Sequence, residues 1–163
     1  MKASRDELMN EYNLMGTSGA LIRRAHQLHD ALWSQLVGGD LTSAQFAVLT
    51  AARRLPGIDQ TQLSVETALD TSTVQAIVVR LVKREWLERV RSQLDQRKYE
   101  VRVTEGGKAA IDAVLPAVRS IPDVLLKELT AEERGVLQQL LLKIVEAPDC
   151  ADTAESGVPR RRR

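Results

Sequence analysis

The apolar positions between about Asn13 and Val37 recur with the period of an α-helix. Leucine and alanine stand at spacings of seven, four, three, four and four residues, at Leu14, Leu21, Ala25, Leu28, Leu32 and Leu36. This period places them in one stripe of an amphipathic helix. The pair Gly38-Gly39 is a stop signal, so we expect the first helix to end there.

A helix-turn-helix is predicted in the middle of the chain. A helix opens at Thr42, whose side chain can exchange hydrogen bonds with Gln45 in a capping box, and stops at Pro56-Gly57. A short helix follows from about Gln60 to Ala68. Another runs from Thr71 to about Arg84. We expect Asp70 to be the N-cap of this last helix, with Val74, Ile77, Val78 and Leu81 on its buried side.

After this helix the period of the apolar positions changes from 3.6 to 2. The segments Trp86–Arg91 and Tyr99–Val103 alternate and are separated by a polar stretch, which predicts a β-hairpin with a charged loop. Thr104 starts a long helical segment that Pro116 and Pro122 should bend or break. A second capping box at residues 130–133 opens a last apolar helix.

The predicted fold class is mainly α with a small β-hairpin (α+β), as a winged helix-turn-helix flanked by long helices. Residues 41–104 form the winged helix-turn-helix region. Residues 1–40 and 105–147 form a helical dimerisation region, because the first and last segments are too apolar for one small chain to cover. Residues 148–163 are polar and unpatterned, which is typical of a disordered tail.

Composition narrows the class of protein further. The chain has 163 residues and a net charge of +1, as expected for one domain of a water-soluble protein. Its single cysteine, Cys150, excludes an internal disulfide. Cys150 lies in the predicted tail, away from any cation pair that would activate it, so we expect no redox role. No apolar run is long enough for a membrane span, and no signal peptide is evident, so the expected location is the cytoplasm.

The charge is unevenly distributed. From Asp70 to Val103 there are eight cations against five anions, an excess of three, although the whole chain has an excess of one. Such a basic segment suits a nucleic-acid partner, and it is equally typical of a solvated helix face beside a charged hairpin. The four arginines at 160–163 could contact phosphates without sequence preference or keep the tail soluble.

Side chains suited to DNA contacts follow the same segment. The predicted helix offers short hydrogen-bonding groups in its first turn and cations in its later turns, and the hairpin loop adds an arginine that an aspartate can orient. The candidate DNA-binding residues are Thr71, Ser72, Thr73, Gln75, Arg80, Lys83, Arg84, Asp95, Arg97 and Lys98.

Together these segments resemble the MarR (multiple-antibiotic-resistance regulator) family of winged-helix transcription regulators. The resemblance rests on residues 41–49, on 70–84, on Asp95-Gln96-Arg97-Lys98 and on Val103-Thr104-Glu105-Gly106-Gly107. It implies that Ser72, Thr73, Gln75 and Arg80 lie on a recognition helix and Arg97 on the wing. One departure is Glu85, where the family usually has a glycine, so the geometry between helix and wing is in question.

The resemblance also implies partners. They are double-stranded DNA with a pseudo-palindromic operator, a second copy of the chain in an obligate homodimer, and a small, often aromatic and anionic effector such as a hydroxybenzoate or a nicotinate-type compound. The function implied is that of a ligand-responsive repressor released from DNA by its effector. An alternative from another class is a winged-helix protein-interaction module that does not bind DNA.

A candidate effector site lies on the first helix. His26, His29 and Trp33 recur at spacings of three and four, with Arg23 beside them, and these groups suit an aromatic carboxylate. The same face could instead be a dimer interface with satisfied histidines. His26 and His29 could share a zinc ion, but no third ligand stands out nearby, so we expect no metal site.

Known catalytic patterns are missing from the sequence. It contains no Gly-x-Ser-x-Gly elbow, no glycine-rich phosphate loop and no His-Glu-x-x-His pattern. We therefore expect neither an enzyme nor a bound cofactor.

Overall fold

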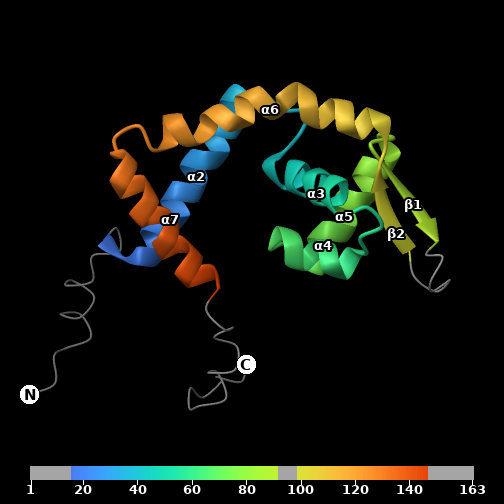
Figure 1. The fold of residues 1–163 in the computed structure, drawn as a ribbon, viewed down its shortest axis with the longest axis horizontal. Coiled ribbons are helices and arrows are strands. Elements are labelled where there is room, and N and C mark those ends of the chain that lie inside the picture. The colour runs from blue at the N-terminus through green and yellow to red at the C-terminus, as the bar shows by residue number, and fades with distance from the viewer. Residues whose placement is uncertain (1–15, 92–98, 147–163) are drawn as a thin grey trace, which may run out of the picture. The chain divides into compact units, whose positions relative to one another are not determined.

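The computed structural model describes residues 16–91 and 99–146, and the chain divides at Leu125 into two units (Figure 1). The predicted fold class is confirmed: the molecule is mainly helical with one two-stranded antiparallel hairpin. The first unit contains α2 (Ser18–Leu36), α3 (Ser43–Arg54), α4 (Gln60–Thr67), α5 (Thr71–Lys83), β1 (Leu87–Arg91), β2 (Tyr99–Val103) and α6 (Glu105–Leu125). The second unit contains α7 (Ala131–Val145).

Most helix starts follow from capping side chains that the sequence already shows. Thr42 and Thr130 each form the predicted capping box, with Gln45 and Glu133 respectively. The first helix is different, because the periodic stripe predicts a start near Asn13 but α2 begins at Ser18. Thr17 is the N-cap here, and its side chain accepts a hydrogen bond from the Ala20 amide at 3.3 Å.

The hydrophobic core lies where α3, α4, α5 and the hairpin meet the start of α6. Side chains less than 2% exposed come from all of the central elements: Val48, Leu49, Leu63, Val74, Val78, Leu81, Leu87 and Val101. The hairpin has the register Leu87↔Val103 to Arg91↔Tyr99. It is joined to the helices through Val101, whose amide donates to the Ile58 carbonyl at 2.9 Å. This core fixes the position of α5.

Helix α6 runs unbroken through both of its prolines, so of the expected bend or break at Pro116 and Pro122 the break does not occur. Each proline removes one backbone donor and crowds the preceding turn. Both rings are exposed, while Ile111 and Ile121 are buried on the side of α6 that packs on the rest of the unit. Packing on that side therefore outweighs the local cost of the prolines.

The start of α6 lies unusually close to the start of the hairpin. A Cβ atom at Gly107 would lie 2.1 Å from the Trp86 carbonyl oxygen, so only glycine fits there. Thr104 links the same two segments, because its hydroxyl donates to the Glu85 carbonyl at 2.6 Å and accepts from the Gly107 amide at 3.0 Å. The glycine and the threonine together hold the base of the hairpin.

The described part of the second unit, residues 126–146, contains one helix, α7, with its own cap. The Arg134 guanidinium donates to the carbonyls of Leu126 and Leu129 at 3.1 and 3.2 Å, which ties the preceding turn to α7. No residue of α7 is buried. Its exposed apolar side chains are Val136, Leu140, Leu141, Leu142, Ile144 and Val145. Among the described residues, no helix combines the length and the apolar character needed to cross a bilayer.

Candidate nucleic-acid interface

Helix α5 has one face in the core and the opposite face in solvent. Val74, Ile77, Val78 and Leu81 are buried, as the sequence predicts. The exposed face carries Thr71, Ser72, Gln75, Val79, Arg80 and Lys83. This face therefore combines hydrogen-bonding groups near the N-terminus of the helix with cations in its last turns, and Val79 adds an apolar group that is 54% exposed.

Asp70 organises the N-terminal turn of α5. Its carboxylate accepts hydrogen bonds from the Thr73 amide at 2.8 Å, from the Thr73 hydroxyl at 2.6 Å and from the Ser72 hydroxyl at 2.5 Å. Hydrogen bonds from Ser72 and Thr73 favour the charged form, so the pKa of the Asp70 carboxyl lies well below its usual value. Two of the predicted DNA contacts, Ser72 and Thr73, are thus held in fixed orientations by a neighbouring carboxylate.

The hydrogen bonds at the C-terminal end of α5 show which conformation Glu85 adopts. The Glu85 amide donates to the Val82 carbonyl and the Trp86 amide to the Leu81 carbonyl, both at 2.9 Å, which is the hydrogen-bond pattern of a Schellman motif. Glu85 has φ of +60°, the left-handed conformation that glycine usually supplies at this position. Glu85 therefore adopts the conformation that a glycine would take here, at the cost of a strained backbone.

Arg84 has contacts within the protein. Its guanidinium donates to the Asp40 carbonyl, between α2 and α3, and lies 5.0 Å from the centre of the Trp86 ring. Its contact with DNA stays a prediction, but the structure adds a role in joining the end of α5 to the segment that precedes α3.

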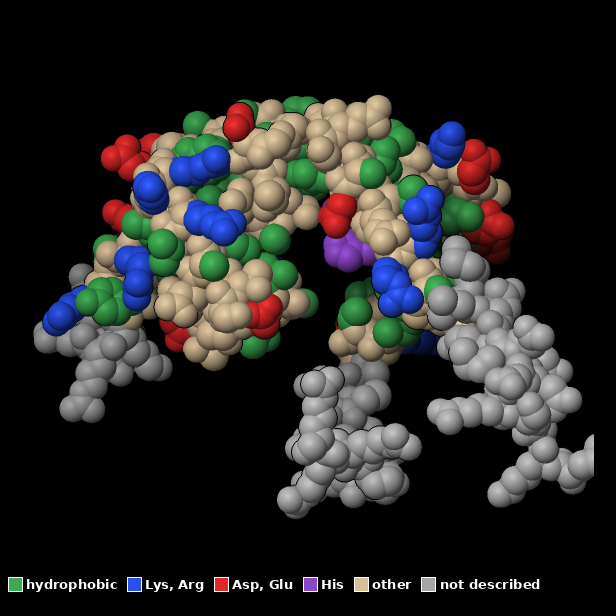
Figure 2. All heavy atoms as spheres, turned by 180° about the vertical axis from the view of Figure 1, so that it is seen from behind, with side chains coloured by type: hydrophobic (Ala, Val, Ile, Leu, Met, Phe, Trp, Pro, Cys, Tyr) green, Lys and Arg blue, Asp and Glu red, His purple; other side chains and the backbone are tan. Residues whose placement is uncertain are grey.

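The hairpin presents a cluster that the candidate set omits. The guanidinium carbons of Arg89 and Arg91 lie 4.6 and 5.9 Å from the centre of the Tyr99 ring. The alternation of Arg89 and Arg91, opposite Tyr99 in the predicted hairpin, is the sequence signal that could have found them. Figure 2 shows Lys and Arg side chains gathered over the part of the first unit that carries the hairpin. Asp95, Arg97 and Lys98 lie outside the described residues.

The candidate effector residues on α2 divide into a buried and an exposed group. Trp33 is 6% exposed, its indole N–H donates to the Leu41 carbonyl at 2.7 Å, and its ring centre lies 5.4 Å from that of Phe46. Arg23 and His26 are exposed and His29 is half-buried, with its ring centre 6.1 Å from that of Trp33. Trp33 therefore packs inward and joins α2 to α3, while the assignment of these four residues to an effector site stays a prediction.

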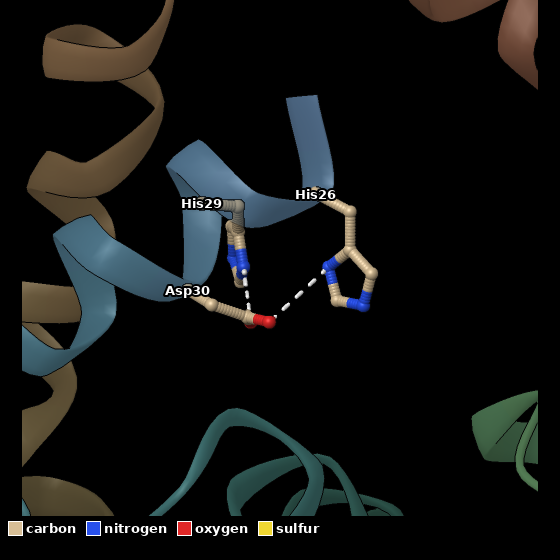
Figure 3. Close-up of side chains that lie close together, drawn as sticks. All are labelled: His26, His29 and Asp30. Atoms are coloured by element: carbon tan, nitrogen blue, oxygen red, sulfur yellow. Dashed lines mark ion pairs between the residues drawn. The ribbon is translucent and has the colours of Figure 1, made fainter. Parts of the chain in front are cut away.

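Asp30 is the residue of this region that sequence reasoning missed. Its carboxylate oxygens lie 3.6 Å from His26 Nδ1 and 3.5 Å from His29 Nδ1 (Figure 3). The expectation that no third possible ligand lies near the two histidines is therefore wrong, because Asp30 lies beside both. The spacing of four residues between His26 and Asp30 brings them to one side of the helix, and this spacing was the available signal.

A recognition-type helix with a polar and basic outer face, followed by a basic hairpin, defines the winged helix-turn-helix class of DNA-binding proteins. Comparisons with known proteins make the assignment specific. Residues 39–98 match the sequence profile of the MarR family. The chain is also 36% identical to the HTH-type transcriptional repressor NicR of Pseudomonas putida, over 86% of this chain and 89% of NicR. The chain therefore belongs to the MarR family and is a DNA-binding transcriptional regulator rather than an enzyme.

Two solved structures resemble the fold closely. One describes regulation of DNA binding of Bordetella bronchiseptica BpsR by 6-hydroxynicotinic acid, with a TM-score of 0.81 and 32% identity, covering 84% of this chain and 99% of BpsR. The other is a mutant of Escherichia coli MarR complexed with operator DNA, with a TM-score of 0.75 and 31% identity, covering 85% of this chain and 98% of the MarR chain.

Proposed function

We propose that the protein is a homodimeric repressor that binds a pseudo-palindromic operator and leaves it when a small aromatic acid binds. The observation that carries this proposal is the outer face of α5, with Gln75, Arg80 and Lys83 exposed on a helix whose inner face is fully packed. Similarity to a repressor and to a regulator with operator DNA supports it. A DNA-bound regulator acts where the chromosome lies, so we propose the cytoplasm as its location.

The proposed DNA contacts follow from position along α5. The hydroxyls of Ser72 and Thr73 donate to Asp70, so their oxygens remain as acceptors for a donor on a base edge. Gln75 is placed one turn later, where an amide can pair with adenine in the major groove. Arg80 and Lys83 contact the flanking phosphates, and Arg97 of the hairpin loop enters the minor groove.

The proposed dimer rests on apolar surface that the chain does not cover. Helix α7 buries none of its residues, and α2 leaves Leu21, Ile22 and Leu28 exposed. Exposed apolar patches of this kind mark interaction surfaces. A second copy of the chain covers them in this proposal, and a twofold-symmetric pair of α5 helices then matches a palindromic site.

The proposed effector site is the face of α2 with Arg23, His26 and His29, backed by the buried Trp33. An exposed guanidinium can bind a carboxylate and the imidazoles can stack on an aromatic ring. BpsR, similar over most of both chains, is regulated by 6-hydroxynicotinic acid. This compound is therefore the first effector to test.

The test is a fluorescence-anisotropy titration of the purified protein on DNA from upstream of its own gene. We expect salt-sensitive binding that prefers this DNA over a scrambled duplex, and release when 6-hydroxynicotinic acid or a hydroxybenzoate is added. Equal affinity for both duplexes contradicts the repressor proposal. Specific binding that no aromatic acid affects contradicts only the effector part.

A pair of substitutions on α5 tests the proposed contacts. Arg80→Ala should weaken binding to all sequences and lower the salt dependence, whereas Gln75→Ala should relax the preference for the operator, each by about 1–3 kcal/mol. Arg97→Ala should cost a similar amount if the wing contacts DNA. Unchanged binding by all three variants places the interface elsewhere.

A further inference from the structure

We propose that His26, His29 and Asp30 form a binding site for a divalent transition-metal ion such as Zn²⁺. The three side chains come from one stretch of α2, and Figure 3 shows the Asp30 carboxylate facing both imidazole rings. One ligand atom from each residue can be chosen so that all three lie within 4.8 Å of one another. The site would supply two nitrogen ligands and one oxygen ligand.

The distances fit a small tetrahedral ion. Zinc bonds to nitrogen and oxygen are about 2.0–2.1 Å long, so two ligands of a tetrahedral ion lie about 3.3–3.4 Å apart. His26 Nδ1 lies 3.6 Å from Asp30 Oδ2 and His29 Nδ1 lies 3.5 Å from the other carboxylate oxygen, Oδ1, so each ring nitrogen is at about this separation from one oxygen of the carboxylate. Small side-chain rotations are enough to close the site around an ion, because the side chains of His26 and Asp30 are 72% and 52% exposed.

The ligand types select the class of metal. Imidazole nitrogen suits zinc, nickel, copper and cobalt, whereas magnesium and calcium prefer sites made of oxygen. The carboxylate adds a negative charge that attracts a divalent cation. Three protein ligands leave a fourth position open for water or for an anion.

The same geometry has a simpler explanation that the experiment must separate from metal binding. A histidine and an aspartate four residues apart on an exposed helix face are neighbours by helix geometry alone, and such exposed pairs contribute little to stability. Such a pair needs no metal. It predicts only weak binding of Zn²⁺ that does not depend on all three side chains.

The test is calorimetric titration of the untagged, full-length protein with Zn²⁺, and visible absorption spectroscopy with Co²⁺ as the probe of ligand geometry. We expect one Zn²⁺ per chain and the absorption of tetrahedral Co²⁺. Loss of a partner that merely supports a ligand typically weakens metal binding 10–100-fold, so His26→Ala and His29→Ala should weaken Zn²⁺ binding by about 100-fold or more. Asp30→Asn should weaken it by about tenfold.

Asp40→Asn is the matched control, because Asp40 is an exposed aspartate beyond the end of the same helix. It should leave Zn²⁺ affinity unchanged. Since the three ligands are at the surface, circular dichroism should show each variant to be folded. Unchanged Zn²⁺ binding in the His26→Ala and Asp30→Asn variants, or octahedral Co²⁺ spectra, overturns the proposal.

The metal site goes beyond the proposed repressor function and can fail independently of it. His26 and His29 are shared with the proposed effector site, but the Zn²⁺ titration contains neither DNA nor effector. Operator binding and effector release measured with a chelator present test the repressor alone. A protein that responds to an aromatic acid but does not bind Zn²⁺ therefore overturns only the metal site.

Discussion

Helices α5 and α7 are both rich in apolar residues, yet the chain buries those of α5 and leaves those of α7 exposed. Four of the thirteen residues of α5 are buried in the core, whereas none of the fifteen residues of α7 is. The described residues of the range 41–104, which we call the reading head, form a buried core within one chain, together with Ile111 of α6. An apolar stripe thus indicates that a surface is to be covered, but it does not indicate whether the same chain covers it.

The largest expected effect, on oligomeric state and operator affinity, comes from placing a charge on the exposed apolar surface of α7. Ile144→Glu would put an unpaired carboxylate into the proposed dimer interface, which is strongly unfavourable. We expect light scattering to show a monomer. Because a monomer contacts only one half-site, operator affinity should fall about 100-fold, or about 2.8 kcal/mol.

Val65→Glu is the matched control for this prediction. Val65 is an apolar residue of α4 in the reading head and is 79% exposed. The substitution should leave the oligomeric state as it is. If Ile144→Glu stays dimeric, or if the unmodified protein is a monomer, α7 is not the dimer surface and the contrast with α5 needs another explanation.

The next effect tests whether the reading head depends on the close approach at Gly107. Gly107→Ala should lower the free energy of unfolding by about 1–3 kcal/mol, because the new methyl group meets the Trp86 carbonyl. Gly106→Ala, one residue earlier, meets only ordinary contacts at 3.5 Å or more and should be neutral or stabilising. Denaturation in urea measures both, and equal stability of the two variants contradicts the packing at this point.

A smaller effect is expected from the cap of α5. The pKa of Asp70 is lowered in the folded state, so its charged form stabilises the fold above the usual carboxyl pKa, near 4. This contribution is lost as the pH falls toward the folded-state pKa. Asp70→Asn should therefore lower the melting temperature at pH 7, and the difference from the unmodified protein should shrink as the pH falls below 4. A difference that does not change with pH shows that the charge of Asp70 does not matter.

The smallest expected effect is a gain in stability. Glu85→Gly should raise the free energy of unfolding by about 0.5–1 kcal/mol, because it removes the strain of a left-handed residue that has a side chain. Glu88→Gly, on the exposed side of β1, should be destabilising instead, because glycine weakens a strand. A loss of stability in both variants means that the Glu85 side chain contributes more than its backbone costs.

The reading head could be predicted from sequence because its signals are local. The capping box at Thr42, the cap at Asp70 and the change of period after Arg84 each act within a few residues. The expected break at the prolines of α6 did not occur because its signal is local, whereas the continuity of the helix depends on distant contacts. Ile111 and Ile121 make these contacts. No local pattern can report such packing.

The candidate sites, too, depend on packing and side-chain orientations that local sequence signals do not show. The periodicity placed Trp33 beside His29 on α2, which is where the structure has it, but it could not show that the indole points to Leu41. Asp30 directly follows His29 in the sequence, but the sequence does not show the side-chain orientations that bring its carboxylate to both rings. The wing residues Arg97 and Lys98 remain predictions, as do the effector contacts.

The segment between α2 and α3 connects α2 to the C-terminal end of α5. The carbonyls of two consecutive residues are held from different sides: Arg84, at the end of α5, binds that of Asp40, and Trp33, on α2, binds that of Leu41. Peptide planes are stiff and Leu41 is buried between them. The two hydrogen bonds therefore attach α2 and the C-terminal end of α5 to the same pair of adjacent peptide groups.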